Sequence, residues 1–391
     1  MSAPSTVAAG LSKATRHAVF MQTWMLINDL YVHPDYGGLD WEAVKEEYSE
    51  KVANAASDEE FYDVMREMVD LLWDEHSSFL VSEVVALQHA IYENLHVPGG
   101  IGAILADSEG ELVLLQVLPD NPAFEAGLRP GEQIVAVDSV PLEQFRSFDE
   151  VVLAIIGEAG TEVVLTVQSV DGIERHVPIK RASVDLGNTL VQATMIDRTN
   201  IALLTIGGLD SPHVAEDVRE TLGELIESGM REGLIVDVRA NPGGDVEALL
   251  DTLALFIPGG SMGTQAGRKE THNLLIPEGE TMPELEGLPI VVLIGPQTSN
   301  AGEWFAAGMQ LYGRATIVGM PSAGNTESVV WHELSDGSVV AIAERVYRLP
   351  DGTLLEGRGV QPDVLVPMDW WLYGAENDPQ MHTAIEMLSS E

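Results

Sequence analysis

The chain has 391 residues, enough to bury a large core and to form two or three domains. Its 62 acidic and 20 basic residues give a formal charge of −42, which argues against binding to nucleic acid or to an anionic membrane. It has no cysteine, so disulfides, thiolate catalysis and zinc–thiolate sites are excluded.

The acidic residues are spread along the chain, which is typical of a solvating acidic surface. No apolar run reaches membrane-spanning length, and Met1-Ser2-Ala3-Pro4 lacks the basic and apolar pattern of a signal segment. We therefore expect a soluble protein that is cytoplasmic by default, or exported if a signal has been removed. No metal site and no cofactor are expected.

Residues 10–95 are predicted to be mainly helical. Phe20, Trp24, Ile27 and Tyr31 are spaced by four, three and four residues, so they form one apolar face. A second apolar face runs from residue 61 to residue 73, after a Ser-Asp-Glu-Glu sequence that is typical of a helix start. The polar segment Asp74-Glu75-His76-Ser77 follows it.

Residues 99–182 carry an ordered series of strand-like alternations separated by glycine turns, including Gly127 and Gly131. The series resembles a PDZ domain of the bacterial, permuted kind. In such a domain the backbone amides of Gly100, Ile101 and Gly102 would receive the terminal carboxylate of a peptide, which then adds as a strand. A small β-domain that binds nothing is the alternative.

From Thr199 the pattern alternates between strand and helix, as expected for a layered α/β core. Strands are predicted at 201–206 and 233–238, with a helix between them at 213–228. The sequence Arg-Ala-Asn-Pro-Gly-Gly at 239–244 then opens a helix that runs to Phe256. The stretch 258–286, rich in Gly, Pro and Glu, is predicted to be a surface excursion.

Residues 288–294 form a continuous apolar run that is typical of a strand buried on both faces. A polar turn follows, and a helix is predicted to begin near Ala301. A strand, a tight turn and a helix start together place backbone N–H groups and a positive dipole end at one point. Hydrolases place nucleophiles at such points, because the same groups stabilise an oxyanion. Further strands are predicted at 315–318, 329–334 and 339–343.

The segment Thr298-Ser-Asn-Ala-Gly-Glu303, the Arg-x-Asn-Pro-Gly-Gly sequence and the closing Gly-Val-Gln-Pro-Asp at 359–363 together resemble the C-terminal processing (tail-specific) serine peptidases. The resemblance implies an α/β fold: a layered crotonase-like (ββα) core with an inserted PDZ domain and an N-terminal helical region. The expected boundaries are 1–95 for the helical region, 96–184 for the PDZ domain and 185–391 for the peptidase-like core.

The resemblance also assigns roles to residues. The attacking serine of the family corresponds to Asn300, and the oxyanion donors correspond to the amides of Gly243 or Gly244 and of Ala301. The lysine of the Ser–Lys branch falls at Asn325, and no lysine follows Lys269. The other branch, similar to the tricorn protease core, implies His76 as the base and Glu356 as its partner.

These roles imply a serine endopeptidase that cleaves unstructured or C-terminally presented polypeptides. An asparagine amide has no ionisable proton near neutral pH, although Asn300 with Glu303 makes a good helix cap. Ser299 is the candidate replacement nucleophile. The alternative is an inactive pseudopeptidase that binds peptide C-termini through its PDZ groove. A third possibility, an unrelated crotonase-like acyl enzyme, does not explain the PDZ series.

Overall fold

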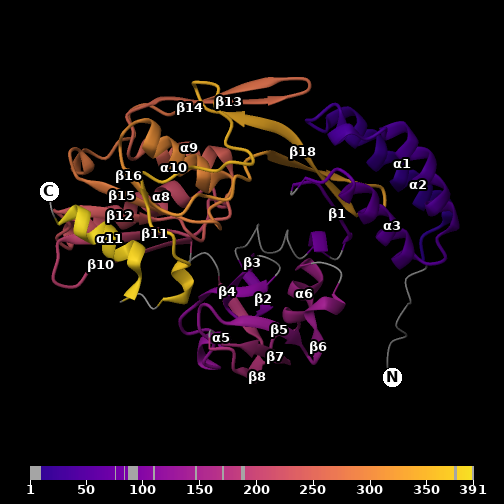
Figure 1. Ribbon diagram of the computed structural model, residues 1–391, viewed down its shortest axis with the longest axis horizontal. Coiled ribbons are helices and arrows are strands. Elements are labelled where there is room, and N and C mark those ends of the chain that lie inside the picture. Colours follow the sequence, from indigo (N-terminus) through magenta and orange to yellow (C-terminus); the bar gives the residue numbers. More distant parts are fainter. Residues whose placement is uncertain are drawn as a thin grey trace. The chain divides into compact units, whose positions relative to one another are not determined.

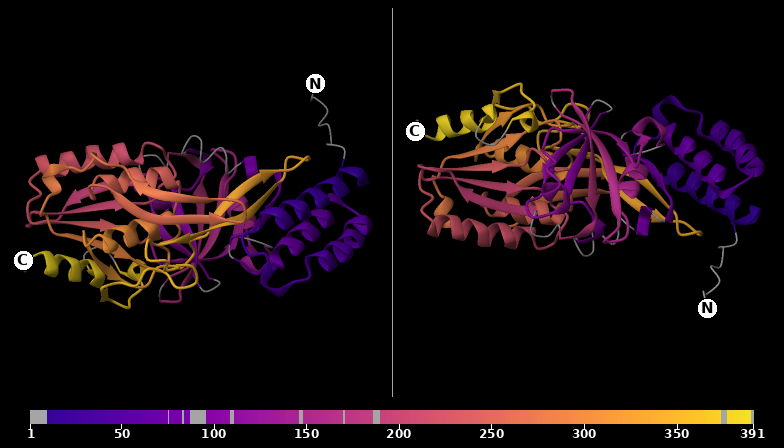
Figure 2. Two further views of the ribbon diagram at one scale, coloured as in Figure 1. Left: turned by 90° about the horizontal axis from the view of Figure 1, so that it is seen from above. Right: turned by 90° about the horizontal axis from the view of Figure 1, so that it is seen from below.

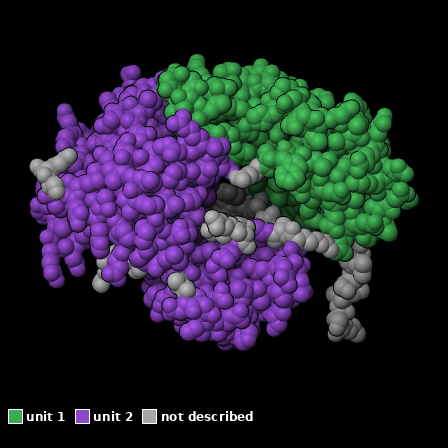
Figure 3. All heavy atoms as spheres, in the orientation of Figure 1, with its two compact units in different colours: residues 1–87, 263–273, 327–356 green, residues 88–262, 274–326, 357–391 purple. Residues whose placement is uncertain are grey.

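The structure is a computed structural model that describes residues 10–74, 76–82, 84–86, 96–108, 111–145, 148–169, 171–185, 190–373 and 377–389. The chain forms two compact units, which are coloured separately in Figure 3. Unit 1 comprises Met1–Leu87, Gly263–Asn273 and Glu327–Glu356, and unit 2 comprises the remainder. Each unit thus combines segments that are far apart in the sequence. The division of the chain at residues 95 and 184 stays a prediction.

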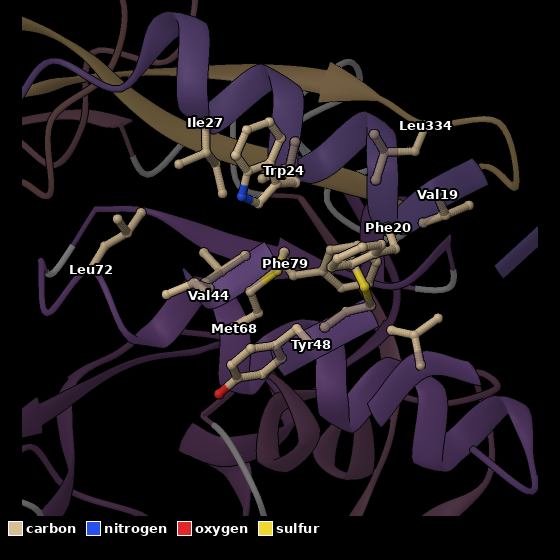
Figure 4. Packing of buried hydrophobic residues seen from close by; sticks show 14 of the residues in the cluster. Val19, Phe20, Trp24, Ile27, Val44, Tyr48, Met68, Leu72, Phe79 and Leu334 are labelled. Atoms are coloured by element: carbon tan, nitrogen blue, oxygen red, sulfur yellow. The ribbon is translucent and has the colours of Figure 1, made fainter. Parts of the chain in front are cut away.

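The helices of unit 1 surround one apolar cluster (Figure 4). The helices are α1 (Lys13–Leu30), α2 (Trp41–Asn54) and α3 (Asp58–Asp70), with a short 3-10 turn η1 (Tyr36–Gly38). Phe20, Trp24 and Ile27 are buried on α1, which confirms the predicted apolar face. Ser57 caps α3, because its hydroxyl accepts from the Glu60 N–H at 3.1 Å.

The sheet of unit 1 is antiparallel and centres on one long strand, β18. Its strands are β1 (Ser78–Leu80), β13 (Gly260–Gly267), β14 (Thr271–Ile276), β17 (Ser328–Glu333) and β18 (Val339–Arg348). The stretch 258–286, predicted as a surface excursion, contains the strands β13 and β14, which were not predicted from the sequence. Residues 264–267 of β13 pair with 345–348 of β18, and a Cβ at Gly263 would lie 1.9 Å from the Arg348 oxygen. The strand β13 is rich in glycine, so it lacks the alternation of apolar and polar side chains by which strands are predicted.

The PDZ-like part of unit 2 contains an antiparallel sheet in the order β3-β4-β5-β7-β8 (Figure 1). Its elements are β2 (His96–Gly100), β3 (Ala103–Ser108), β4 (Glu111–Val117), α5 (Pro122–Glu125), β5 (Gln133–Val137), β6 (Val140–Pro141), η2 (Leu142–Gln144), α6 (Phe148–Ile155), β7 (Glu162–Gln168), β8 (Glu174–Lys180) and β9 (Ala182–Asp185). Among the described residues β3 pairs with β4 alone, so β3 is an edge strand.

The second sheet of unit 2 has the order β10-β11-β12-β15-β16-β19 and is parallel except at β10. Its elements are β10 (Val191–Met195), β11 (Ile201–Ile206), α8 (Val214–Glu227), β12 (Gly233–Asp237), α9 (Val246–Ala254), η3 (Pro283–Leu285), β15 (Ile290–Ile294), α10 (Ala301–Leu311), β16 (Thr316–Gly319), β19 (Val364–Leu365), η4 (Trp370–Leu372) and α11 (Pro379–Leu388). These bounds agree with the predicted strands and helices to within a few residues.

Helices cover both faces of the parallel sheet (Figure 2). Ala384 and Leu388 of α11 pack in one cluster with Ile235 and Leu293 of the central strands. Every residue of β12 and β15 is buried, as the continuous apolar runs predicted. Among the described helices, none has the length together with the apolar character that crossing a bilayer requires.

Candidate active site

Two loops meet where the neighbouring parallel strands β12 and β15 end. Leu234 of β12 pairs with Ile290 of β15, so the carboxyl ends of both strands lie at one edge of the sheet. The 239–244 loop follows β12, and the turn into α10 follows β15. The Ser299 N–H donates to the Asn241 carbonyl at 2.9 Å, which joins the two loops directly.

Asn300 occupies a sharp turn between β15 and α10. Its backbone has φ 46° and ψ −119°, a conformation that is costly for any residue with a side chain. Its N–H donates to the Asn325 carbonyl at 2.8 Å. A strained strand-to-helix turn of this kind is the backbone setting in which α/β hydrolases present a nucleophile.

Gly243 and Gly244 lie against this turn. A Cβ at Gly243 would lie 2.7 Å from the Asn300 Cβ and 3.2 Å from the Ala301 nitrogen, so only glycine fits there. The Gly243 N–H donates to the Asn241 Oδ1 at 2.8 Å. The N–H groups of Gly244 and Ala301, in contrast, donate to no acceptor within the described part of the chain.

The buried side chains of Asn241 and Arg239 hold the 239–244 loop in place. Asn241 is fully buried, and its Nδ2 donates to the Ile206 carbonyl at 3.0 Å. The buried guanidinium of Arg239 pairs with Asp237 at 2.7 Å and with Asp378 at 2.6 Å. The pKa of Arg239 is raised, since these two carboxylates outweigh the burial that lowers it. Buried side-chain hydrogen bonds and ion pairs therefore hold this loop in place.

Glu303 ties the first turn of α10 to the 322–325 segment. Its fully buried carboxylate accepts from the Ser322 hydroxyl at 2.5 Å and from the N–H groups of Gly324 (2.7 Å), Asn325 (2.9 Å) and Asn300 (3.2 Å). Burial raises the pKa of Glu303, and the four hydrogen bonds offset only part of this rise. Asn325, which stands at the lysine position of the resemblance, contacts the turn through its backbone.

Asp210 lies beside the glycine loop on the segment that follows β11. A Cβ at Gly244 would lie 2.7 Å from the Asp210 nitrogen and 2.2 Å from the Leu209 carbonyl carbon. Burial and, to a smaller extent, the charge of Asp245 raise the pKa of Asp210 to about 6, although a backbone hydrogen bond offsets part of the rise. No local sequence pattern indicates Asp210, because its burial depends on the neighbouring glycine loop.

His76 and Glu356 form a pair within unit 1. His76 Nε2 lies 2.9 Å from Glu356 Oε1, and the imidazole is only 5% exposed. Asp74 shapes the loop, because its Oδ1 accepts from the N–H groups of His76 (3.1 Å) and Ser77 (2.5 Å). A carboxylate only accepts, so Nε2 carries the proton and Nδ1 of the neutral ring is left as the acceptor.

The electrostatics of this pair favour a charged imidazole. Burial lowers the pKa of His76, but the hydrogen bond and charge of Glu356, with the charges of Glu327 and Asp74, outweigh it and leave the pKa raised. Within the described residues no group of three or more histidine and carboxylate side chains is arranged to hold a metal ion.

An apolar groove of about 280 Å³ lies between β3 and α6 of the PDZ-like sheet. It includes the predicted peptide-binding residues Gly100, Ile101 and Gly102, and Gly102 has a positive φ of 74°. Phe148, Val152 and Ile155, spaced by four and three residues on α6, line the opposite wall. All of its lining side chains are apolar.

The structure thus brings together Asn300, Ala301, Gly243 and Gly244 in unit 2, and His76 with Glu356 in unit 1. Ser299 stands next to the turn, and its hydroxyl donates weakly to the Asn325 carbonyl at 3.4 Å. Sequence reasoning assigned no role to the Asn241 side chain, although its place in the Arg-x-Asn-Pro-Gly-Gly sequence was a usable signal.

Comparisons with known protein families match three separate parts of the chain. Residues 200–366 match Peptidase family S41, residues 12–70 match the Tricorn protease C1 domain, and residues 113–169 match a PDZ domain. A carboxyl-terminal-processing protease of Synechocystis sp. is 26% identical over 395 residues, covering 97% of this chain and 88% of that protein. A probable CtpA-like serine protease of Staphylococcus epidermidis is 24% identical over 331 residues, covering 85% of this chain and 64% of that protein.

Solved structures show the same fold. The photosystem II D1 C-terminal processing protease superposes with a TM-score of 0.71 at 23% identity, covering 90% of this chain and 93% of that one. Mature CPAF gives a TM-score of 0.57 at 14% identity, covering 96% of each chain. Together these matches confirm the predicted α/β fold with a PDZ domain and N-terminal helices.

We predict that Glu303→Gln destabilises unit 2. The amide nitrogen of glutamine cannot accept a hydrogen bond, so it leaves at least one of the four buried donors unpaired. Urea unfolding at pH 7 should show a loss of about 2 kcal/mol in the free energy of unfolding. Glu224→Gln on the exposed face of α8 is the matched control and should change it little. Equal stability of both variants would contradict the assigned network.

We predict that Asp210→Asn stabilises the protein only at higher pH. Because the folded-state pKa is raised, the folded state binds this proton more tightly than the unfolded chain does, so stability falls as pH rises from about 4 to above 6. Asparagine removes this penalty. Urea unfolding should show a gain of about 1–3 kcal/mol at pH 7.5 and almost none at pH 4. Asp251→Asn, on the exposed side of α9, should show no such pH-dependent gain.

Proposed function

The chain belongs to the PDZ-containing C-terminal processing peptidase family, and from this premise we propose that it binds polypeptides at a peptidase-type site whose attacking serine is replaced by Asn300. The observation that carries the proposal is the backbone of Asn300. It keeps the strained turn of a nucleophile while its side chain is a carboxamide. In the chain as given, binding is therefore the primary function, and serine-dependent hydrolysis needs residue 300 to be serine.

The proposed oxyanion hole consists of main-chain donors. Ala301 N–H stands at the first position of α10, where an N–H has no partner within the helix and the helix dipole is positive. Of the two glycines, Gly244 is the better donor, because the Gly243 N–H is already bonded to Asn241. Neither donor depends on a side chain, so the replacement at residue 300 does not remove them.

The proposed base is His76. Glu356 holds Nε2, so Nδ1 is the nitrogen available to take a proton from a nucleophile. Glu356 also stabilises the imidazolium that would form. A Ser–Lys mechanism is not supported, because the corresponding position is Asn325 and its backbone carbonyl faces the Asn300 N–H.

A serine endopeptidase that uses Ser299 is the second candidate. In its favour, Ser299 adjoins the turn and its hydroxyl is held only by a 3.4 Å contact. Against it, the acceptor of that contact is a carbonyl, which cannot remove the proton as a base would. Ser299 also precedes the strained residue rather than occupying it.

We predict that Asn300→Ser creates proteolytic activity. Cleavage of β-casein, an unstructured protein, should be at background for the unmodified chain and at least about 1,000-fold faster for Asn300→Ser, because a serine, a base and an oxyanion hole act as a unit in serine peptidases. Asn300→Ser combined with His76→Ala should return the rate to background.

The controls separate the two candidates. Cleavage by the unmodified chain that is lost in Ser299→Ala would favour the second candidate and contradict the first. Cleavage by Asn300→Ser that persists without His76 would contradict the proposed base. Circular dichroism of each variant checks that the fold is retained.

We further propose that the PDZ groove captures free polypeptide C-termini with apolar side chains. The edge strand β3 offers backbone groups for strand addition, and the groove beside it is lined only by apolar side chains. Phe148 and Val152 would contact side chains upstream of the terminal residue, since they lie nearer the start of α6 than Ile155 does.

We predict that a fluorescent decapeptide ending in Val-Leu-Val binds at least about 10-fold more tightly with a free C-terminus than with an amidated one. Val152→Asp should abolish the binding, because it places a charge in the apolar groove. Val140→Asp, at an exposed position of β6 outside the groove, is the matched control. Fluorescence anisotropy measures both, and equal affinity for the two peptides would exclude carboxylate capture.

A further inference from the structure

A second histidine–carboxylate pair lies next to the first one in unit 1. His33 Nε2 is 2.7 Å from Glu327 Oε1, and the Glu327 N–H donates to Glu356 Oε2 at 3.0 Å. Since Glu356 Oε1 contacts His76, the four residues form a continuous series from His33 through Glu327 and Glu356 to His76. Glu356 is thus held at both oxygens.

Burial and exposure differ sharply along this series. The Glu327 side chain is 2% exposed, whereas the His33 side chain is 46% exposed. His33, Glu327 and Glu356 line one pocket of unit 1, together with Arg268 and Arg348. His33 therefore connects a buried carboxylate to solvent.

In this series two carboxylates, Glu327 and Glu356, lie between two histidines. Two neighbouring carboxylates repel each other, and each contacts one histidine: Glu327 contacts His33 and Glu356 contacts His76. Burial raises the pKa of Glu327, the charges of His33 and His76 lower it, and the charge of Glu356 raises it. A buried carboxylate costs stability unless it is paired and hydrogen-bonded, and His33 is the partner of Glu327.

We propose that Glu327, with His33 as its partner, is a positioning residue that orients Glu356 through its main chain and adds negative charge beside the imidazolium of His76. Glu327 acts through Glu356 and His76 and does not itself touch a substrate. The inference deepens the proposed function, because it concerns the same proposed base.

Other charged groups also face this cluster and belong in the account. Asp74 accepts from the His76 N–H and adds negative charge, and Asp74 and Glu327 both raise the pKa of Tyr31 after burial of that phenol. Within the described part of the chain, Asp35, Arg268 and Arg348 also lie near the cluster. None of them replaces the contact that Glu327 makes with Glu356.

The test is a histidine titration by NMR on the full chain. Glu327→Gln removes the charge and keeps the size and the backbone donor, so the titration midpoint of His76 should fall by about 1 pH unit. Glu327→Asp, which keeps the charge, should restore most of the shift. Glu344→Gln is the matched control, because Glu344 pairs with His332 across β17 and β18 of the same sheet.

An unchanged His76 midpoint in a folded Glu327→Gln protein would overturn the proposal. If that variant does not fold, His33→Gln tests the same link from its exposed end. Removal of the imidazole that contacts Glu327 changes the surroundings of this carboxylate, so the His76 curve should move, and an unmoved curve would again overturn the proposal.

The titration does not depend on catalysis, so it separates this inference from the proposed function. In an active Asn300→Ser background, Glu327→Gln should also move the acid limb of kcat/KM to lower pH by the same amount, because the base must be unprotonated to act. If Asn300→Ser cleaves nothing, the proposed function is overturned, whereas the inference about Glu327 is not. A midpoint shift without a matching shift of the acid limb would contradict the role of His76 as the base.

Discussion

One buried carboxylate organises the site in unit 2. Glu303 accepts from the Asn300 N–H, from two N–H groups of the 324–325 segment and from the Ser322 hydroxyl, and the Ser322 oxygen in turn accepts from the Val360 N–H at 2.6 Å. Three chain segments that are distant in sequence therefore converge on one side chain. The strained backbone of Asn300 persists because these bonds, with the bond to the Asn325 carbonyl, determine its conformation.

In this arrangement the backbone around residue 300 is held by hydrogen bonds to Asn241, Glu303 and Asn325. The turn, the glycine loop and the first N–H of α10 are set by backbone bonds, by Asn241 and by Glu303. A change of the side chain at residue 300 therefore leaves these backbone positions in place.

Local patterns predicted most of the fold. Apolar runs marked β12 and β15, and helical spacing marked α1 and α10, because each signal lies within a dozen residues. The glycine-rich strand β13 was missed, since it lacks the side chains that create an alternating pattern. Short sequence motifs predicted the Arg-x-Asn-Pro-Gly-Gly loop and the turn at Asn300. The burial of Asp210 and the contact of Glu327 with Glu356 arise only from tertiary packing, which no local pattern encodes.

The edge strand β3 has a consequence for the solution behaviour of the protein. Among the described residues its outer backbone groups have no strand partner, so two copies could join edge to edge through them. A charge of −42 per chain opposes that encounter at low ionic strength. At about 1 M salt the screening length shrinks to about 3 Å, and the long-range repulsion between copies is lost. The negative charge of the chain therefore opposes association through the open edge of the sheet at low salt concentration, and this protection is lost at high salt.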